Sequence, residues 1–127
     1  MKTDYRKVYG QSELLDTFLN QSAGGVMNKI KKLERNRYSI LTDNMNQCYL
    51  CGRRKQHLHE VFFGRNRQLS MKYGCVVPLC FSCHEKVHNN YSIDLKLKQE
   101  CQKRYMDYYE VDEESFIKTF RNNYLRK

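Results

Sequence analysis

Four of the six cysteines in this 127-residue chain form two Cys-x-x-Cys pairs. Cys48 and Cys51 make the first pair, Cys80 and Cys83 make the second, and 28 residues lie between the pairs. Thiolate sulfur is a preferred ligand of structural Zn²⁺, which four such ligands surround as a tetrahedron. The spacing therefore predicts a structural zinc site formed by all four cysteines.

Disulfides, a redox pair and inert thiols are the alternatives for the same cysteines. The chain begins with a polar and charged stretch rather than an apolar secretion signal, which favours a reducing cytoplasm and hence metal binding. A redox motif would require one pair after a strand in a thioredoxin-like pattern, which fits two pairs poorly. Cys75 and Cys101 lie outside both pairs, and we expect them to pack as small apolar side chains.

Histidines accompany the cysteine pairs. His84 follows Cys83 directly and His88 comes four residues later, while His59 lies between the pairs and is followed by Glu60. Positions four apart share one face of a helix, so we expect His84 and His88 to lie side by side. Histidine is the natural proton acceptor near neutral pH, so these residues add candidates for acid–base chemistry.

A β-hairpin is expected between the two cysteine pairs. Residues 57–63 contain an apolar run and predict a first strand, and residues 75–79 predict the returning strand. Pro78, near the end of the second strand, indicates a sheet edge or a strand exit. Residues 64–73 are basic and polar and are expected to form the loop of the hairpin.

Helices are expected on both sides of this hairpin. Ser82 and Glu85 have the spacing of a capping box, which predicts a helix that begins near Cys83. Apolar residues at helical spacing and capping residues (Ser92 and Asp112) predict the other helices: residues 13–19, 26–37, 93–109 and 112–124.

The length and composition favour one α+β domain over residues 1–127. We expect a helical N-terminal extension over 1–47, a zinc-containing core over 48–91, and C-terminal helices over 92–127 that pack on the core. Hydrophobic residues make up 40% of the chain, which allows a modest core that a zinc ion would supplement. No apolar run approaches the ~18 residues of a membrane span. We therefore expect no membrane association, and we expect a cytoplasmic location.

The chain is strongly basic, with a formal net charge of +9. The excess is greatest in residues 48–88, which hold seven basic and two acidic side chains. A basic surface attracts nucleic-acid phosphates, although it also serves solubility alone. Because the charge lies beside the cysteine pairs, it favours nucleic acid as a partner.

The segment from Cys48 to His88 resembles the zinc-braced branch of the HNH endonuclease family. The resemblance rests on the two cysteine pairs, on residues 58–61 (Leu-His-Glu-Val) and on residues 79–88, which read Leu-Cys-x-x-Cys-His-x-x-x-His. More loosely, residues 59–67, 72–74 and 120–125 are similar to small HNH proteins encoded by bacteriophages and prophages. A phage-encoded protein would work in the cytoplasm of the bacterial host cell.

The resemblance implies a ββα-metal fold with two kinds of metal. The four cysteines would hold the structural Zn²⁺, and a catalytic divalent ion, Mg²⁺ or Mn²⁺, would lie between hairpin and helix. His84 and His88 match the ligand positions on the helix, and His59 matches a position on the first strand. The activity implied is metal-dependent hydrolysis of DNA phosphodiester bonds, with a strand histidine activating the water.

Two positions depart from the family pattern. The first strand usually carries Asp-His or His-His, with the ligand first and the base second, whereas here the residues are His59 and Glu60. Either His59 is the ligand and Glu60 the base, or His59 is the base and Glu60 supports the metal or polarises the histidine. An unperturbed pKa of ~4.3 makes Glu60 the weaker candidate for the base. Cys75 occupies the place of the usual Asn, for which Asn66 is a candidate substitute.

Basic and polar residues near the hairpin are the candidates for DNA contact. They would bind phosphates and position the DNA without reading much sequence. These residues are Arg53, Arg54, Arg65, Asn66, Arg67 and Lys72, with His57 as a further candidate for a phosphate contact.

Three functions compete on this basis. The first is an endonuclease that nicks DNA as a monomer or cuts both strands as a homodimer, in phage recombination, repair or packaging. The second is a non-catalytic, zinc-braced DNA-binding module derived from the same scaffold, for which Glu60 and Cys75 argue. The third is a zinc ribbon that binds a protein partner through the tyrosine-rich helices.

Overall fold

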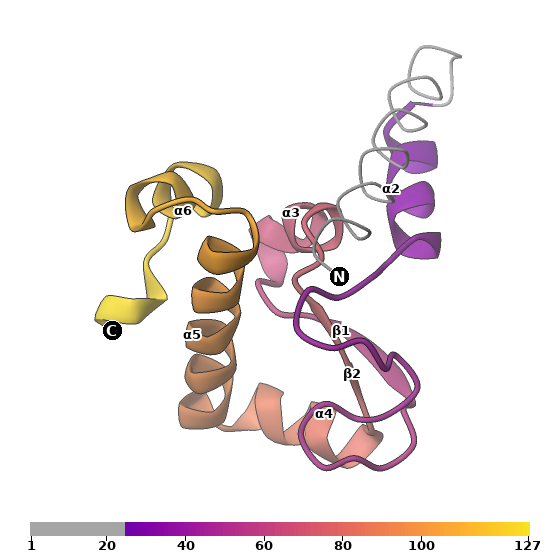
Figure 1. Ribbon diagram of the computed structural model, residues 1–127. Helices are drawn as coiled ribbons and strands as arrows, with labels where there is room; N and C mark the ends of the chain where they lie inside the picture. The colour runs from indigo at the N-terminus through magenta and orange to yellow at the C-terminus, as the bar shows by residue number, and fades with distance from the viewer. Residues whose placement is uncertain (1–24) are drawn as a thin grey trace.

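The computed structural model describes residues 25–127, so the helix predicted over 13–19 lies outside the described part. The fold is α+β, with a small two-stranded sheet and several helices, as the sequence predicts (Figure 1). In chain order the elements are α2 (Gly25–Arg35), β1 (His57–Glu60), the 3-10 helix η1 (Gly64–Asn66), α3 (Arg67–Lys72), β2 (Val76–Leu79), α4 (Phe81–Asn89), α5 (Tyr91–Tyr108), α6 (Glu113–Phe120) and the 3-10 helix η2 (Tyr124–Arg126).

The two strands form the predicted antiparallel hairpin. His57 pairs with Leu79, and the ladder ends where Glu60 pairs with Val76. The first strand is shorter than predicted because regular pairing ends at Glu60, although the Val61 N–H still donates to the Cys75 carbonyl. Every residue of β2 is buried, so this strand is covered on both faces.

The connection between the strands is helical, which corrects the prediction of a loop over residues 64–73. Its polar composition concealed an inward-facing side: Ser70 and Met71 are fully buried, and Leu69 packs against the core. The Ser70 hydroxyl accepts a hydrogen bond from the Phe62 N–H and donates to the Phe62 carbonyl. These two bonds fix α3 against the end of β1.

Each face of the hairpin packs on a different set of side chains. Val77 and Leu79 face the main core, which α5, α6 and η2 complete with Phe116, Phe120 and other buried residues. Leu58 and Val76 face a smaller cluster that contains Leu33 of α2. Because successive residues of a strand point to opposite faces, His57 and His59 share the first face and Glu60 lies on the second.

The capping residues of α4 and α5 differ from those predicted. Helix α4 is capped by Cys80, whose Sγ accepts from the Cys83 N–H, so the capping box at Ser82 is not formed. Helix α5 is capped by Asn90, two residues before the predicted cap at Ser92. Asp112 caps α6 as predicted, because its carboxylate accepts from the Ser115 N–H.

Both strands of the hairpin pack against one helix, α4. Helix α4 follows β2 directly and packs against both strands, and α5 turns back along the core (Figure 1). Cys75 and Cys101 are fully buried in this core, as predicted for small apolar side chains. Helix α4 therefore links the hairpin to the cysteine pairs and to the histidines.

Candidate metal centres

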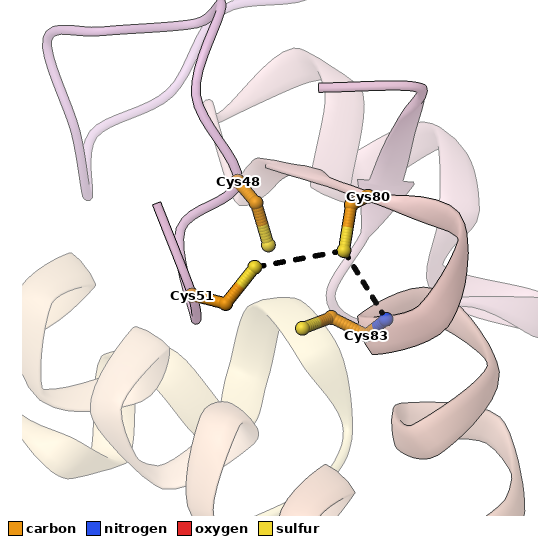
Figure 2. Close-up of side chains that lie close together, drawn as sticks. All are labelled: Cys48, Cys51, Cys80 and Cys83. Carbon is orange, nitrogen blue, oxygen red and sulfur yellow. Dashed lines mark hydrogen bonds between the residues drawn. The ribbon is translucent and has the colours of Figure 1, made fainter. Parts of the chain in front are cut away.

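The four cysteines of the two pairs converge at the N-terminus of α4. Cys48 and Cys51 come from the loop before β1, Cys80 from the end of β2 and Cys83 from the first turn of α4 (Figure 2). Their sulfur atoms all lie within 4.8 Å of one another, and the Sγ atoms of Cys51 and Cys80 are 3.6 Å apart. A tetrahedral Zn²⁺ with Zn–S distances of about 2.3 Å holds its sulfurs about 3.8 Å apart, so the spacing fits this ion.

A tight turn shapes the first cysteine pair. The Gly52 N–H donates to the Cys48 carbonyl, and the Cys48 N–H donates to the Arg53 carbonyl. Gly52 has a φ of +80°, a left-handed conformation that glycine adopts without strain. The turn points both sulfurs of the pair toward α4 (Figure 2).

The surroundings of the thiols suit a bound cation. Burial opposes the ionisation of Cys48, but hydrogen bonds from nearby backbone groups outweigh it and lower the pKa of its thiol. Burial and the three neighbouring thiols raise the pKa of Cys83. A divalent cation would offset the repulsion among four adjacent thiolates, and a coordinated thiol is deprotonated. The cluster could therefore hold a metal such as zinc, with all four positions filled by sulfur.

A second group is formed by the histidines. The ligand nitrogens of His59, His84 and His88 all lie within 4.8 Å of one another, and those of His84 and His88 approach to 3.1 Å. His57 joins this group, with its Nδ1 2.8 Å from the Nδ1 of His84. All four histidines of the chain thus meet where β1 packs on α4.

His59 is the most enclosed member of the histidine group. It is 3% exposed, and its Nε2 is buried without a hydrogen-bond partner among the described residues. Burial, followed by the charges of the neighbouring histidines and of Lys98, lowers the pKa of His59 to about 3. Burial also lowers the pKa of His84. Neutral imidazoles are the form that binds metal, and the unpartnered Nε2 leaves a lone pair for an ion or a water molecule.

The donor atoms indicate which ions fit the histidine group. No carboxylate belongs to it in the part of the chain from residue 25 onward. Imidazole suits transition ions such as Zn²⁺, Ni²⁺ and Fe²⁺, whereas Mg²⁺ prefers oxygen ligands and keeps several waters. The expectation of catalytic Mg²⁺ therefore has no support in this donor set.

Glu60 is placed apart from the histidines. Its carboxylate accepts from Arg37 Nη1 at 2.6 Å and from Arg67 Nε at 3.1 Å, on the face of β1 opposite to His59. Its side chain is 11% exposed, so these bonds satisfy a largely buried charge. This geometry does not support the predicted catalytic role of Glu60, which instead joins β1 to α3 and to the segment after α2.

The candidate DNA contacts fall into two sets. Arg53, Arg54 and Arg65 are exposed, as a phosphate contact requires. Arg67 forms ion pairs with Glu34 and Glu60. Asn66 is 8% exposed, and its side-chain amide donates to the Phe120 carbonyl, so it holds α6 to the hairpin connection rather than facing a ligand.

Lys72, the remaining candidate, is half-buried, and its ammonium lies 5.5 Å from the centre of the Tyr73 ring.

The histidine group has neighbours that the sequence does not predict as site residues. Phe63 and Phe81 contact the histidines. Lys98 likewise influences His59. The signal for Phe81 was its position inside the second cysteine pair, where a large apolar residue has no core to fill.

The sequence matches no protein-family model, and neither curated proteins nor solved structures give a match. The resemblance to HNH endonucleases therefore stays a prediction. Within residues 25–127, no helix has the length and apolar character that crossing a bilayer requires.

Proposed function

We propose that this chain is a metal-dependent nuclease of the HNH type that hydrolyses phosphodiester bonds in DNA. The observation that carries the proposal is the histidine group: three ligand nitrogens converge from a hairpin and a helix, and one of them is buried with no hydrogen-bond partner within residues 25–127. Exposed arginines lie on the neighbouring cysteine turn, where they can contact phosphates. The site thus combines ion ligands, a proton acceptor and positive charge, which phosphodiester hydrolysis requires.

His84 and His88 would hold the divalent ion, because both lie on one face of α4 with their Nε2 atoms 3.1 Å apart. An ion bound there supplies positive charge to the phosphate and to the departing 3′ oxygen. The Cys80–Cys83 turn positions this face, since it caps the same helix. Zinc in the cysteine cluster would therefore stabilise the helix that presents both ligands.

His59 is the proposed general base. Its Nε2 has no hydrogen-bond partner among the described residues, whereas the ring nitrogens of His84 contact two other imidazoles. The low pKa of His59 makes it a weak base in the free protein, and we expect the negative charge of a bound phosphate to raise that pKa. His59 would take a proton from a water molecule whose oxygen attacks phosphorus. The bond from phosphorus to the 3′ oxygen then breaks, and this oxygen takes a proton from solvent.

The test is cleavage of supercoiled plasmid, linear duplex and single-stranded DNA by zinc-loaded protein with Mg²⁺, Mn²⁺ or Ni²⁺. We expect cleavage that is faster with Mn²⁺ or Ni²⁺ than with Mg²⁺, and that His59→Ala and His84→Ala abolish. Glu85→Gln, an exposed change on the same helix, is the control that keeps activity. Cleavage that persists in both histidine variants would refute the proposal.

Metal content distinguishes two roles for His59. If His59 is the base, His59→Ala keeps the second metal equivalent and loses cleavage. If it is a third ligand, the variant loses both the metal equivalent and cleavage. His84→Ala is the reference, because it removes a ligand in either case.

A non-catalytic, zinc-braced DNA-binding module is the second candidate. Two residues favour this function. Cys75 is fully buried at the position where HNH enzymes usually have Asn, and the Glu60 carboxylate is already bound in ion pairs with two arginines. This function predicts DNA binding by the zinc-loaded protein and no cleavage with any divalent ion.

A further inference from the structure

Among residues 25–127, two phenylalanines are exposed and three are buried in the core. Phe62, Phe116 and Phe120 are at most 1% exposed, whereas Phe63 is 41% and Phe81 is 52% exposed. An exposed phenylalanine gains little from burial in the monomer, so two of them at one place require an explanation.

Both exposed rings contact the histidine group. The Phe81 ring centre lies 5.9 Å from that of His57, and the Phe63 ring centre lies 5.2 Å from that of His88. His57 contacts His84 at 4.8 Å, and His84 contacts His88 at 4.7 Å. A continuous row of ring contacts therefore runs from Phe81 through the histidines to Phe63, with an exposed aromatic ring at each end.

Positive charge accompanies each of these rings. Arg53 and Arg54 line, together with Phe81, an open hollow of about 470 Å³. At the other end, the ammonium of Lys98 lies 4.3 Å from the centre of the Phe63 ring, but its side chain is only 15% exposed and pairs with Asp94, so the phosphate contacts would come from Arg53 and Arg54. Aromatic faces next to cations are the combination that binds single-stranded nucleic acid, whose bases stack on the rings while its phosphates contact the cations.

We propose that the histidine site acts on single-stranded or locally unpaired polynucleotide, with bases on either side of the reacting phosphate stacked on Phe63 and Phe81. This inference rests on the proposed nuclease function and names its substrate class. In a duplex the faces of the bases are covered by their neighbours in the stack, and only their edges are open in the grooves. Exposed phenylalanines beside a phosphodiester site thus discriminate in favour of unstacked bases.

The test measures binding rather than cleavage. Fluorescence anisotropy follows zinc-loaded protein binding to a labelled DNA strand of mixed sequence, to the same strand annealed to its complement, and to an RNA strand of equal sequence, with the probe checked for intact length afterwards. We expect Phe63→Ala and Phe81→Ala each to weaken binding of the single strand by about tenfold, the effect of losing one stacked base. Binding of the duplex should change little.

Matched variants keep this test decisive. Phe63→Tyr and Phe81→Tyr retain the ring and should retain affinity for the single strand. Ile117→Ala, a change of an exposed apolar residue on α6, should alter neither affinity, and zinc content reports whether each variant is folded. An RNA strand that loses affinity in the same way would also support the proposal and would add RNA to the substrates.

Equal affinity of the alanine variants and the wild type for the single strand would overturn the inference, even if the histidine-dependent cleavage of DNA is real. Conversely, loss of single-strand affinity in a protein that never cleaves would refute the nuclease function and leave a single-strand-binding surface. The two failures are therefore distinguishable.

Discussion

His59 and Glu60 are neighbours in the chain, yet they serve opposite faces of the hairpin. Side chains of a strand alternate between faces, so the residue that points toward α4 and the residue that points toward α2 cannot exchange roles. The histidine lies with three other imidazoles, and the glutamate lies between Arg37 and Arg67. The proposed function therefore assigns chemistry to His59 alone, and the ion pairs of Glu60 assign that residue to stability.

Replacing Glu60 by Gln tests this division. Glu60→Gln removes the charge from two hydrogen-bonded pairs, so we expect the free energy of unfolding to fall by about 1.5–3 kcal/mol, the usual value for hydrogen bonds to charged groups. Urea unfolding measures this change, and the rate of DNA cleavage should stay the same. Glu85→Gln makes the same change of charge at an exposed position and should alter stability little. Loss of cleavage with unchanged stability would instead assign Glu60 to the chemistry.

The cysteine cluster connects elements that are distant in sequence. The loop before β1 supplies two sulfurs, and the end of β2 and the start of α4 supply the other two. In a small domain, a metal bound by such a set contributes directly to the free energy of folding. The same cluster caps the helix that carries His84 and His88, so the cysteine cluster and the histidine group share one element.

We therefore expect Cys51→Ser to lose the structural zinc, to lower the unfolding temperature and to speed hydrogen exchange in α4. Zinc content by mass spectrometry, thermal unfolding and amide exchange measure these effects. Cys101→Ala is the control, because Cys101 is buried in the core outside the cluster and its replacement should leave the zinc in place. A Cys51→Ser protein that keeps a full equivalent of tightly bound zinc would show that the cluster does not hold it.

The N-cap of α6 predicts a pH dependence of stability. Hydrogen bonds from Ser115 hold the pKa of the Asp112 carboxyl below its usual value in the folded chain. A depressed pKa in the folded state means that the unfolded state takes up the proton first, so this stabilisation is present above the unfolded pKa and is lost as the pH falls through the folded pKa. We expect Asp112→Asn to lower the unfolding midpoint near neutral pH and to differ less from the wild type in acid. A difference between the two proteins that is constant at every pH would contradict the assignment.

Sequence patterns predicted some elements well and missed others for physical reasons. The hairpin and the Asp112 cap follow from local signals, namely apolar runs and a side chain that bonds to the backbone three residues on. The sequence predicts a loop where α3 forms, because the burial of α3 depends on hydrogen bonds between Ser70 and Phe62 that no periodicity in the sequence indicates. The cap at Cys80 is not predicted because cysteine is not one of the usual N-cap residues, although its sulfur accepts the Cys83 N–H here.

At the scale of the whole molecule, the sequence predicted which residues would meet better than how they would be used. The spacing of the cysteines predicts that their four sulfurs meet, and they do. All four histidines also lie together. The sequence does not predict which basic residues are exposed and which are held in ion pairs. Arg53 and Arg54 are exposed, whereas Arg67 is held in ion pairs, and this depends on the distant partners Glu34 and Glu60.

Because the chain is strongly basic, with a net charge of +9, the salt dependence of nucleic-acid binding can separate the arginines that contact phosphates from those that do not. Each phosphate contact that a protein makes with a single strand contributes about 0.7 to the slope of log affinity against log salt concentration. We expect Arg53→Ala and Arg54→Ala each to weaken binding at low salt and to reduce that slope by about this amount. Arg67→Ala should leave the slope unchanged and lower the free energy of unfolding instead, because its guanidinium already pairs with two carboxylates. An equal loss of slope in all three variants would show that Arg67 leaves its ion pairs to contact the nucleic acid, and that the basic surface extends around the hairpin to the face opposite the histidines.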